Sequence, residues 1–438
     1  MTDATPQSKS KAGRLKLLVS AYACEPDKGS EPGVGWTWVR QIATREECWV
    51  ITRANNRAVI ENRLSAHPMP NAHFVYYDLP AWARFWKKGS RGVRAYYYLW
   101  QIGAYRVARK LHRAIDFDLA HHVTFGSYWL PSFLALLPVP FIWGPVGGGE
   151  SAPKTFRKSF SFRGRIFEFL RDASRFVRER DPFVRMTARR AAACLATTPE
   201  TALRLRALGA RDVALAMQFA WSPEEINESA PLLPRKTGCF RVISLGRFLH
   251  WKGFGLGIEA FAKFHREFPS SEYWLVGDGP ERKRWAKLAR RLGVEDSVIF
   301  CGSVSRSAAM SKMAESDVLL HPALHDASPM VVAEAMRARI PVVCLDIGGP
   351  GIEVTEGSGI KVPAISPEQA VDGIALAMKR LAEDPARSAE IGNAARERMK
   401  EAFSWERKGI FLATLYDRIT AGSDGGKRSC HTAAALTA

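Results

Sequence analysis

Cysteine is scarce in this 438-residue chain, and its seven copies are scattered. Their number is odd, and none of them has the paired spacing of a metal-binding motif. This distribution argues against a disulfide framework and a structural zinc site, and it favours a reducing compartment. The cysteines are Cys24, Cys48, Cys194, Cys239, Cys301, Cys344 and Cys430.

The chain also lacks a long hydrophobic run. Its most apolar window, residues 133–146, is broken by Pro138, Pro140 and Pro145 and is too short to span a bilayer. The N-terminal stretch MTDATPQSKSKAGRLK is polar and contains no signal-peptide core. We therefore expect a cytoplasmic protein, and its length predicts two domains with separate hydrophobic cores.

Acidic residues are under-represented in the first half of the chain. Residues 1–235 carry 35 Lys and Arg against 20 Asp and Glu, whereas residues 236–438 carry 28 against 24. Such an excess of cations attracts anionic partners. No recognisable nucleic-acid module accompanies it, so we expect no nucleic-acid partner and consider an anionic membrane surface, at the inner face of the membrane, instead.

Two segments concentrate this positive charge, and each is open to two interpretations. Residues 84–113 hold nine Lys and Arg and no acid, with aromatic residues between them. They form either a helix on an anionic membrane surface or a helix that packs its aromatics into the core. Residues 154–190 hold twelve Lys and Arg and four acids, with apolar residues at helical spacing. They form either amphipathic helices for a membrane or lipid-linked acceptor, or a solvated arginine-rich face.

Short apolar runs alternate with helical periodicity along the whole chain, which predicts an α/β fold with two doubly wound, Rossmann-like parallel sheets. The polar, proline-rich stretch 222–238 is typical of an interdomain linker. Strands are predicted at residues 15–21, 49–52, 74–77, 118–124, 141–143, 192–196 and 213–217 before it, and at 240–245, 272–276, 298–301, 317–321, 341–345 and 360–362 after it.

The helix between the strands at 317–321 and 341–345 has a well-marked start. Ser328 suits the N-cap and Pro329 the first helical position. The amides of Met330 and Val331 would then be free to bind an anion such as a phosphate.

Two carboxylates accompany this helix. Asp326 lies in the loop before it, and Glu334 lies within it among apolar residues. An acid in so apolar a helix faces water, meets a partner or binds a ligand, because burying it alone is costly. This window by itself allows both an exposed and a ligand-binding Glu334.

Cations and glycines follow several other predicted strands. Arg247 and Lys252 come after the strand at 240–245, where two cations suit a diphosphate, with ordinary surface charge as the alternative. Gly33 and Gly35 stand between the first strand and a helix predicted from residue 36 to 45. There they form either a ligand loop or a tight turn.

A third glycine cluster, GPVGGGE at residues 144–150, follows the strand at 141–143 and predicts a close approach of backbone and ligand. The strand at 118–124 carries His121 and His122, and successive strand residues point to opposite faces. At most one of the two histidines can therefore reach a given cleft, and a buried, structurally satisfied histidine is the alternative.

Together these motifs resemble the retaining glycosyltransferases of family 4. The resemblance covers nearly the whole chain and is most specific in the second half. It rests on EPGVGW at 31–36, Gly-Arg at 246–247, Lys-Gly at 252–253, GDGP at 277–280, and an acid and a Glu separated by seven residues. The family's first acid is usually Glu, and here it is Asp326.

The resemblance implies the two-domain GT-B fold. Its N-terminal, acceptor-side domain would span residues 14–221 and its C-terminal, donor-binding domain residues 239–403. A final helix at 404–420 would pack back onto the first domain. We expect residues 1–13 and 421–438 to be disordered.

The resemblance also implies roles for individual residues. Arg247, Lys252 and the helix start at Met330 and Val331 would stabilise the departing diphosphate. Glu334 would bind the ribose hydroxyls, and Asp326 would hold the transferred sugar. Further residues would line the donor site (Gly33, Gly35, Gly277), the reacting centre (His121) and the acceptor side (Gly147, Gly148, Glu150).

The implied activity is sugar transfer, with retention of anomeric configuration, from a UDP- or GDP-linked donor to a lipid-linked or saccharide acceptor in surface polysaccharide biosynthesis. No cofactor is implied. No Asp-x-Asp motif at a strand end suggests a bound metal. Two alternatives remain open: a nucleotide-sugar epimerase of the same fold, and a non-catalytic protein that binds nucleotide sugar or membrane.

Overall fold

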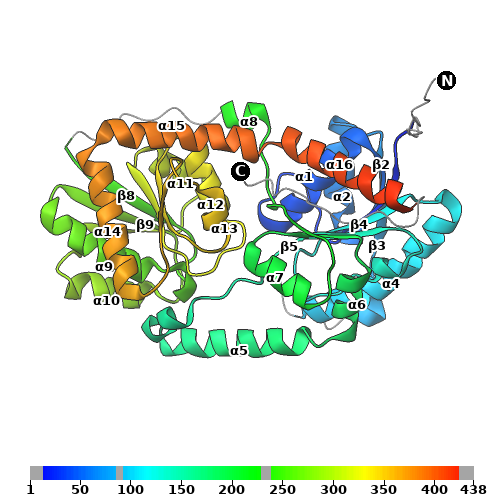
Figure 1. The fold of residues 1–438 in the computed structure, drawn as a ribbon, viewed down its shortest axis with the longest axis horizontal. Helices are drawn as coiled ribbons and strands as arrows, with labels where there is room; N and C mark the ends of the chain where they lie inside the picture. Colours follow the sequence, from blue (N-terminus) through cyan, green and yellow to red (C-terminus); the bar gives the residue numbers. More distant parts are fainter. Residues whose placement is uncertain (1–12, 85–91, 228–237, 424–438) are drawn as a thin grey trace, which may run out of the picture.

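The computed structural model describes residues 13–84, 92–227 and 238–423, and two parallel sheets organise them (Figure 1). The seven-stranded sheet has the order β3-β2-β1-β4-β5-β6-β7 and contains β1 (Lys16–Ala21), β2 (Glu47–Arg53), β3 (Ala72–Tyr77), β4 (Leu119–Thr124), β5 (Phe141–Val146), β6 (Ala193–Ala196) and β7 (Val213–Leu215). The six-stranded sheet has the order β10-β9-β8-β11-β12-β13 and contains β8 (Phe240–Leu245), β9 (Ser271–Val276), β10 (Val298–Gly302), β11 (Val318–His321), β12 (Val342–Leu345) and β13 (Ile360–Val362).

All pairings within both sheets are parallel. Each predicted strand is present, and the predicted α/β fold with two doubly wound sheets is confirmed. We call the parts built around the seven-stranded and six-stranded sheets the N-terminal and C-terminal domains. Their boundaries at residues 221 and 239 remain predictions.

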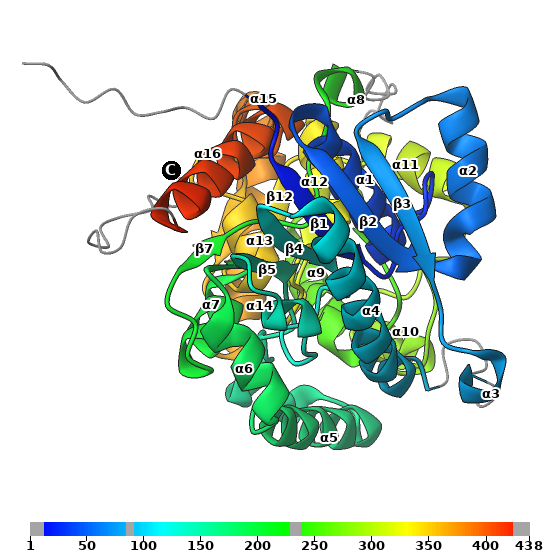
Figure 2. The same ribbon diagram turned by 90° about the vertical axis from the view of Figure 1, so that its right-hand side faces the viewer.

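Helices cover the sheets and connect their strands (Figures 1 and 2). Before the predicted linker they are α1 (Ser30–Arg45), α2 (Arg57–Ala66), α3 (Ala81–Arg84), α4 (Val93–Ile115), α5 (Phe162–Arg178), α6 (Pro182–Arg190) and α7 (Pro199–Ala207), and α8 (Pro223–Asn227) lies within the predicted linker. The others are α9 (Phe254–Glu267), α10 (Arg282–Arg291), α11 (Arg306–Ala314), α12 (Met330–Arg337), α13 (Gly348–Glu353), α14 (Pro367–Glu383), α15 (Pro385–Ala402) and α16 (Trp405–Ser423).

The central strands, such as β1, β4 and β11, are buried on both faces, which is why they read as continuous apolar runs. In β1, Leu18 packs into the cluster that includes α4, whereas Leu17 and Val19 pack on the opposite face with α1 and α16. Several helix starts also follow directly from the sequence. Ser366 caps α14 and Asp384 caps α15, and each is followed by a proline at the first helical position.

The chain passes between the two domains at Trp221 and again at Ser404, and these two segments lie side by side. Trp221 pairs with Ser404, and the amides of Trp221 and Trp405 bond to the carbonyls of Phe403 and Trp221 at 2.9 and 3.1 Å. After the second crossing, α16 contacts α1 of the N-terminal domain (Figure 1). The buried ammonium of Lys408 donates to the carbonyls of Met217 and Phe219 and so fixes the crossing.

Three sequence predictions are affected by this arrangement. The predicted linker contains α8, and α16 extends to Ser423 into the predicted disordered tail. The rest of the predicted linker and ends, and residues 85–91 of the first basic segment, lie outside the described residues. In α4, Tyr96, Tyr97 and Trp100 are fully buried, which favours the core interpretation for this segment over the membrane interpretation.

No helix in the described parts of the chain is long and apolar enough to cross a membrane.

Candidate active site

The strand order of each sheet reverses at one point, and doubly wound folds bind ligands at the carboxyl ends of strands beside such a point. In the C-terminal domain the reversal lies between the neighbouring strands β8 and β11. Arg247 and Lys252 follow β8, and Asp326 follows β11. The fold therefore brings three distant residues that the sequence singled out to one edge of the sheet.

Arg247 is an unpaired cation at this edge. Its side chain is exposed, and it makes no hydrogen bond or ion pair with another residue in the described ranges. Gly246 before it has a φ of +146°, and a Cβ on Gly277 would lie 2.0 Å from the carbonyl oxygen of Gly246. Gly277, which we predicted to border the donor, is therefore required for packing against the loop that carries Arg247.

Lys252 and Asp326 form an ion pair with 2.6 Å between Nζ and Oδ2, and Nε2 of His321 lies 3.4 Å from the same oxygen. Burial alone would raise the pKa of Asp326. The Lys252 ammonium and the His321 imidazole outweigh burial and hold that pKa well below its usual range. Asp326 is therefore a charged carboxylate at neutral pH, and it holds Lys252 in a fixed position.

The helix start at α12 differs in detail from the prediction. The N-cap residue is Pro329, the helix begins at Met330, and no side chain caps it. Ser328 is not the N-cap, because the first helical hydrogen bond joins Val332 N to Pro329 O. The buried hydroxyl of Ser328 has no protein partner in the described residues. The amides of Met330 and Val331 have no acceptor in the same part of the chain, which leaves them open toward an anion.

Glu334, one turn into α12, is buried with an exposed fraction of 8%, so the exposed alternative for this residue is wrong. Its carboxylate forms an ion pair with Arg306 at the start of α11. Burial raises the pKa of Glu334, and the charges of Arg306 and Arg337 partly oppose that shift. A carboxylate held in this way can accept hydrogen bonds from neutral hydroxyls of a ligand.

The glycines after β1 do not form the predicted loop. Helix α1 begins at Ser30 and not at residue 36, so Gly33 and Gly35 lie inside it. A Cβ on either residue would lie 1.9 Å from a backbone carbonyl oxygen, that of Lys28 for Gly33 and that of Ala23 for Gly35. These glycines let the first turns of the helix pack on the chain that precedes it. The predicted loop is therefore wrong, whereas the predicted place of Gly33 and Gly35 at the donor site stays a prediction.

His121 does not reach the cleft. It is fully buried, its Nδ1 accepts from Tyr416 Oη at 2.8 Å, and its Nε2 donates to Gly144 O at 2.8 Å. Burial lowers its pKa to about 3, so the ring is neutral. His122 is also buried, beside Tyr97 and the Phe125 carbonyl. The structurally satisfied alternative therefore holds for His121, and the prediction of a catalytic role for it is wrong.

The glycine loop after β5 does lie at the cleft. A Cβ on Gly147 would meet the Ala327 side chain at 3.1 Å, so the two domains approach each other here. Glu150 is buried, and its carboxylate accepts from the hydroxyl of Thr201 (2.8 Å) and the amide of Gly148 (3.1 Å). Glu150 therefore positions the loop through both carboxylate oxygens, and its predicted place on the acceptor side stays a prediction.

A cavity of about 320 Å³ separates the two domains at this place. From the C-terminal domain it is lined by Ala327, Ser328 and Met330, and from the N-terminal domain by Ser30, Glu31, Val34, Phe125, Gly126, Ser127, Gly147, Gly148, Gln218 and Phe219. It therefore joins the start of α12 to the ends of β4 and β5 and can hold a sugar.

Glu31 is the one acidic residue among the described residues that line this cavity, and the sequence analysis did not single it out. It sits in the first turn of α1, and its carboxylate accepts a hydrogen bond from the amide of Gly126. Burial raises its pKa to about 7, although the Gly126 bond opposes the shift. The only available signal was its position in EPGVGW, the segment that resembles the family loop.

No group of three or more His, Cys, Asp or Glu side chains that could hold a metal ion occurs within residues 13–84, 92–227 and 238–423.

Comparison with known proteins agrees with this architecture. Residues 227–398 match the family model described as glycosyl transferases group 1. The lipopolysaccharide core biosynthesis glycosyltransferase LpsD of Rhizobium meliloti is 28% identical over 222 residues, which cover 50% of this chain and 62% of that protein. A glycogen synthase of Mycobacterium tuberculosis is 26% identical over 182 residues, which cover 41% and 43%. The chain thus spans about half the length of these curated relatives.

Solved structures match over nearly the whole chain. Sucrose-phosphate synthase from Thermosynechococcus elongatus superimposes with a TM-score of 0.63 at 18% identity, covering 93% of this chain and all of that one. Anabaena HepE in complex with UDP and glucose gives 0.58 at 19% identity, covering 92% and 100%. At such identities the likeness shows the fold alone.

The two facing doubly wound domains define a protein of the GT-B fold. Residues 227–398 match the glycosyl transferases group 1 family, which confirms for this part of the chain the resemblance seen in the sequence.

Proposed function

We propose that this protein is a retaining glycosyltransferase that moves a sugar from a nucleotide diphosphate to a lipid-linked or saccharide acceptor. The observation that carries the proposal is the cationic edge of the C-terminal domain. The unpaired Arg247, the fixed Lys252 and the open amides of Met330 and Val331 lie around the ends of β8 and β11. This arrangement suits the charge of a diphosphate.

The charge of the departing diphosphate grows as its bond to the sugar breaks, so these groups stabilise the transition state more than the bound donor. Glu334 is placed on the same helix to accept hydrogen bonds from the ribose hydroxyls. Asp326 is placed in the loop before that helix to hold the sugar. Met330 and Ser328 line the cavity directly and so border the bound donor.

Sugar transfer with retention requires the new bond to form on the face that the diphosphate leaves. The cavity offers no pair of close carboxylates like that of retaining glycosidases among its described lining residues, since Glu31 is the one acid there. We therefore assign no enzyme nucleophile. The acceptor oxygen bonds to the anomeric carbon as the bond to the diphosphate oxygen breaks, and the acceptor proton passes to that oxygen.

The acceptor enters from the N-terminal side, along Gly147, Gly148 and Glu31. Glu31 can bind an acceptor hydroxyl in either protonation state because its pKa lies near neutrality. The comparisons support a sugar acceptor of the cell surface, since LpsD is a lipopolysaccharide core enzyme by its description. They support a UDP-sugar donor as well, since HepE is described with UDP and glucose. We place the reaction on the cytoplasmic side of the membrane.

A panel of nucleotide sugars tests the proposal. UDP-glucose, GDP-mannose and their free nucleotides are screened for thermal stabilisation, and the stabilising donor is incubated with a bacterial lipid extract while nucleotide release is followed. We expect one donor to raise the melting temperature and to release nucleotide only with extract. Glu334→Ala should abolish release, and the exposed control Glu356→Ala should not.

Three outcomes contradict the proposal. If no donor stabilises the protein, the site does not bind nucleotide sugars. Nucleotide release without any acceptor would favour the epimerase alternative, and binding without any turnover would favour the non-catalytic one.

A further inference from the structure

Helix α5 is amphipathic in the inverse sense: its polar side faces the protein and its apolar side faces solvent. The residues it buries are Gly164, Glu168 and Arg175. Its exposed apolar side chains are spaced so that, at about 100° of turn per residue, they fall on one side of the helix. We call these residues the α5 stripe: Phe162, Ile166, Phe169, Leu170, Phe176 and Val177, which are 43% to 70% exposed.

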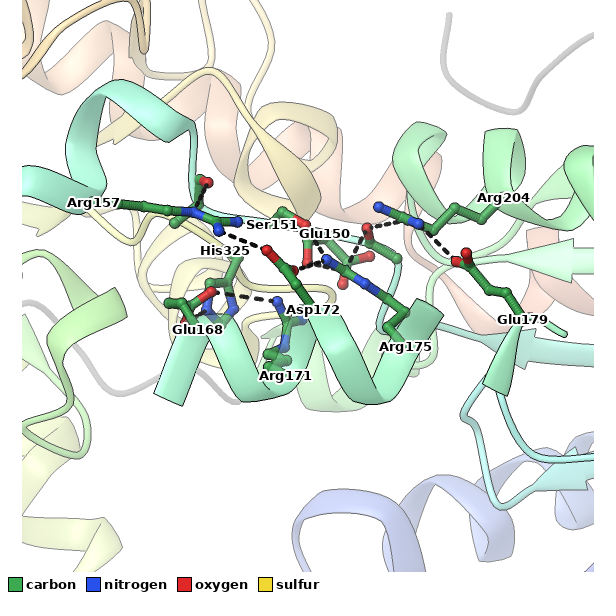
Figure 3. Close-up of polar contacts among 12 residues, drawn as sticks. Glu150, Ser151, Arg157, Glu168, Arg171, Asp172, Arg175, Glu179, Arg204 and His325 are labelled. Carbon is green, nitrogen blue, oxygen red and sulfur yellow. Dashed lines mark hydrogen bonds and ion pairs between the residues drawn. The ribbon is translucent and has the colours of Figure 1, made fainter. Parts of the chain in front are cut away.

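The inward side of α5 is occupied by polar bonds to both domains (Figure 3). Glu168 accepts from Nε2 of His250 and of His325 in the C-terminal domain, each at 3.0 Å. Arg175 donates to the carbonyls of Gly149 (3.2 Å) and Glu150 (3.0 Å) in the N-terminal domain. Because these bonds fix the rotation of the helix, the α5 stripe cannot turn into the core.

The acids of this region are all used internally. Besides Glu168, Asp172 pairs with Arg157 at 2.6 Å and with Arg175 (Figure 3). Glu179 pairs with Arg204 at 2.7 Å and accepts from Tyr128 at 2.6 Å. Asp181 caps α6 and accepts from Tyr98.

The exposed charges around the α5 stripe are therefore cations. Arg163 and Arg165 flank the stripe on its two sides, are exposed, and form no ion pair with a residue of the described chain. Lys154, Lys158 and Arg180 are exposed nearby. An apolar stripe of this kind with a cationic rim is the surface that an anionic lipid bilayer recognises.

We propose that the α5 stripe docks on an anionic membrane surface. A second copy of the chain would fit less well, because an isologous contact over the stripe would bring the arginines of both copies together. Helix α5 runs along the lower margin of the molecule in Figures 1 and 2. His325, which α5 binds on its inner side, is the neighbour of Asp326. A docked membrane would therefore lie about one helix diameter, ~10 Å, from the candidate site. In this last respect the inference rests on the proposed function, because the membrane would present a lipid-linked acceptor to the cleft.

Vesicle flotation of the full chain tests the docking surface. The protein is mixed with vesicles of phosphatidylcholine alone or of phosphatidylcholine with phosphatidylglycerol, and the bound fraction is measured at low and high salt. We expect binding to the anionic vesicles that weakens with salt. The double variant Phe169→Ser, Phe176→Ser should lower the partition coefficient about tenfold or more. Arg163→Gln with Arg165→Gln should lower it and reduce its salt dependence.

The matched control is Leu376→Ser on α14, an exposed apolar residue away from α5, and it should bind vesicles like the wild type. The proposal is overturned if the wild type does not float with anionic vesicles, or if the Phe169→Ser, Phe176→Ser variant floats equally well. It is also overturned if the wild type is a dimer without vesicle binding and that variant is a monomer. UDP binding, measured in parallel, reports on the donor site separately, so failure of the docking surface and failure of the proposed function are distinguishable.

Discussion

Glu31 offers a prediction whose sign and size follow from its surroundings. Burial raises its pKa from 4.5 to about 7. Between these two values the folded protein binds more protons than the unfolded chain, so the free energy of unfolding falls as the pH rises through this window. A shift of one pKa unit corresponds to about 1.36 kcal/mol. Ionisation of Glu31 in the folded protein therefore lowers the free energy of unfolding by about 3 kcal/mol above pH 7, but by only about 1 kcal/mol at pH 5.

Replacing Glu31 with Gln removes this titration but keeps an oxygen that can accept the Gly126 amide. When the pH is raised from 5 to 8, the free energy of unfolding of the variant should therefore rise by about 2 kcal/mol relative to that of the wild type. This difference does not depend on what the substitution does to packing. Urea unfolding followed by tryptophan fluorescence at both pH values measures the difference. Glu356→Gln, at an exposed carboxylate, is the control and should give none. Parallel pH profiles for the wild type and Glu31→Gln would refute the raised pKa of Glu31.

Three further substitutions test the interpretation of other residues. Gly35→Ala should lower the free energy of unfolding by about 3 kcal/mol in urea unfolding, because its Cβ meets a backbone oxygen. The control Gly29→Ala should be nearly neutral, because its Cβ would meet nothing within 4 Å. Equal effects of the two substitutions would contradict the packing role of Gly35. His121→Phe should lower the free energy of unfolding by about 2 kcal/mol, because it leaves the Tyr416 hydroxyl and the Gly144 carbonyl unpaired. It should leave the UDP affinity, measured by calorimetry, unchanged. A selective loss of UDP affinity would show that His121 does contribute to the donor site. Lys252→Met should lower the free energy of unfolding by about 3 kcal/mol or more, because it leaves the buried charge of Asp326 without its partner. Adding Asp326→Asn should restore much of the stability but not the UDP affinity. Recovery of both would show that Lys252 acts only as a structural partner.

The fold was predictable because the strands are short apolar runs separated by segments with helical periodicity. Parallel sheets covered on both faces leave little ambiguity in the apolar pattern, as in β8, whose predicted and observed bounds coincide. The helix starts were less certain: the sequence predicts Ser328 as the N-cap and Pro329 as the first helical residue, whereas α12 begins at Met330.

The errors at the candidate site arose where one residue type serves two purposes. Gly33 and Gly35 were interpreted as a ligand loop, yet proline and glycine are also tolerated in the first turns of a helix, and here the close neighbour is the protein's own backbone. The alternation of β4 showed that only one of His121 and His122 could face a given side. It could not show that Tyr416, nearly 300 residues later, supplies the partner of His121. The unusual pKa of Glu31 depends on the loop that closes over it, which no local pattern encodes.

The sequence left open which side of α5 faces solvent, since residues 154–190 allow both a membrane helix and a solvated arginine-rich face. Its apolar spacing predicts a helix correctly, but the usual inference buries the apolar side. The polar side is buried instead because Glu168 and Arg175 meet partners from both domains, and those partners lie far away in the chain.

The central claim is that the C-terminal domain binds a nucleotide diphosphate at the end of β8. Calorimetric titration of UDP and of GDP into the wild type and into Arg247→Ala tests it most directly, with Arg266→Ala on α9 as the control for an exposed arginine elsewhere. We predict that one nucleotide binds the wild type and the control equally, and that Arg247→Ala lowers the affinity about tenfold or more without changing the melting temperature of the free protein. Equal affinity in all three proteins, or binding of neither nucleotide, would contradict the account.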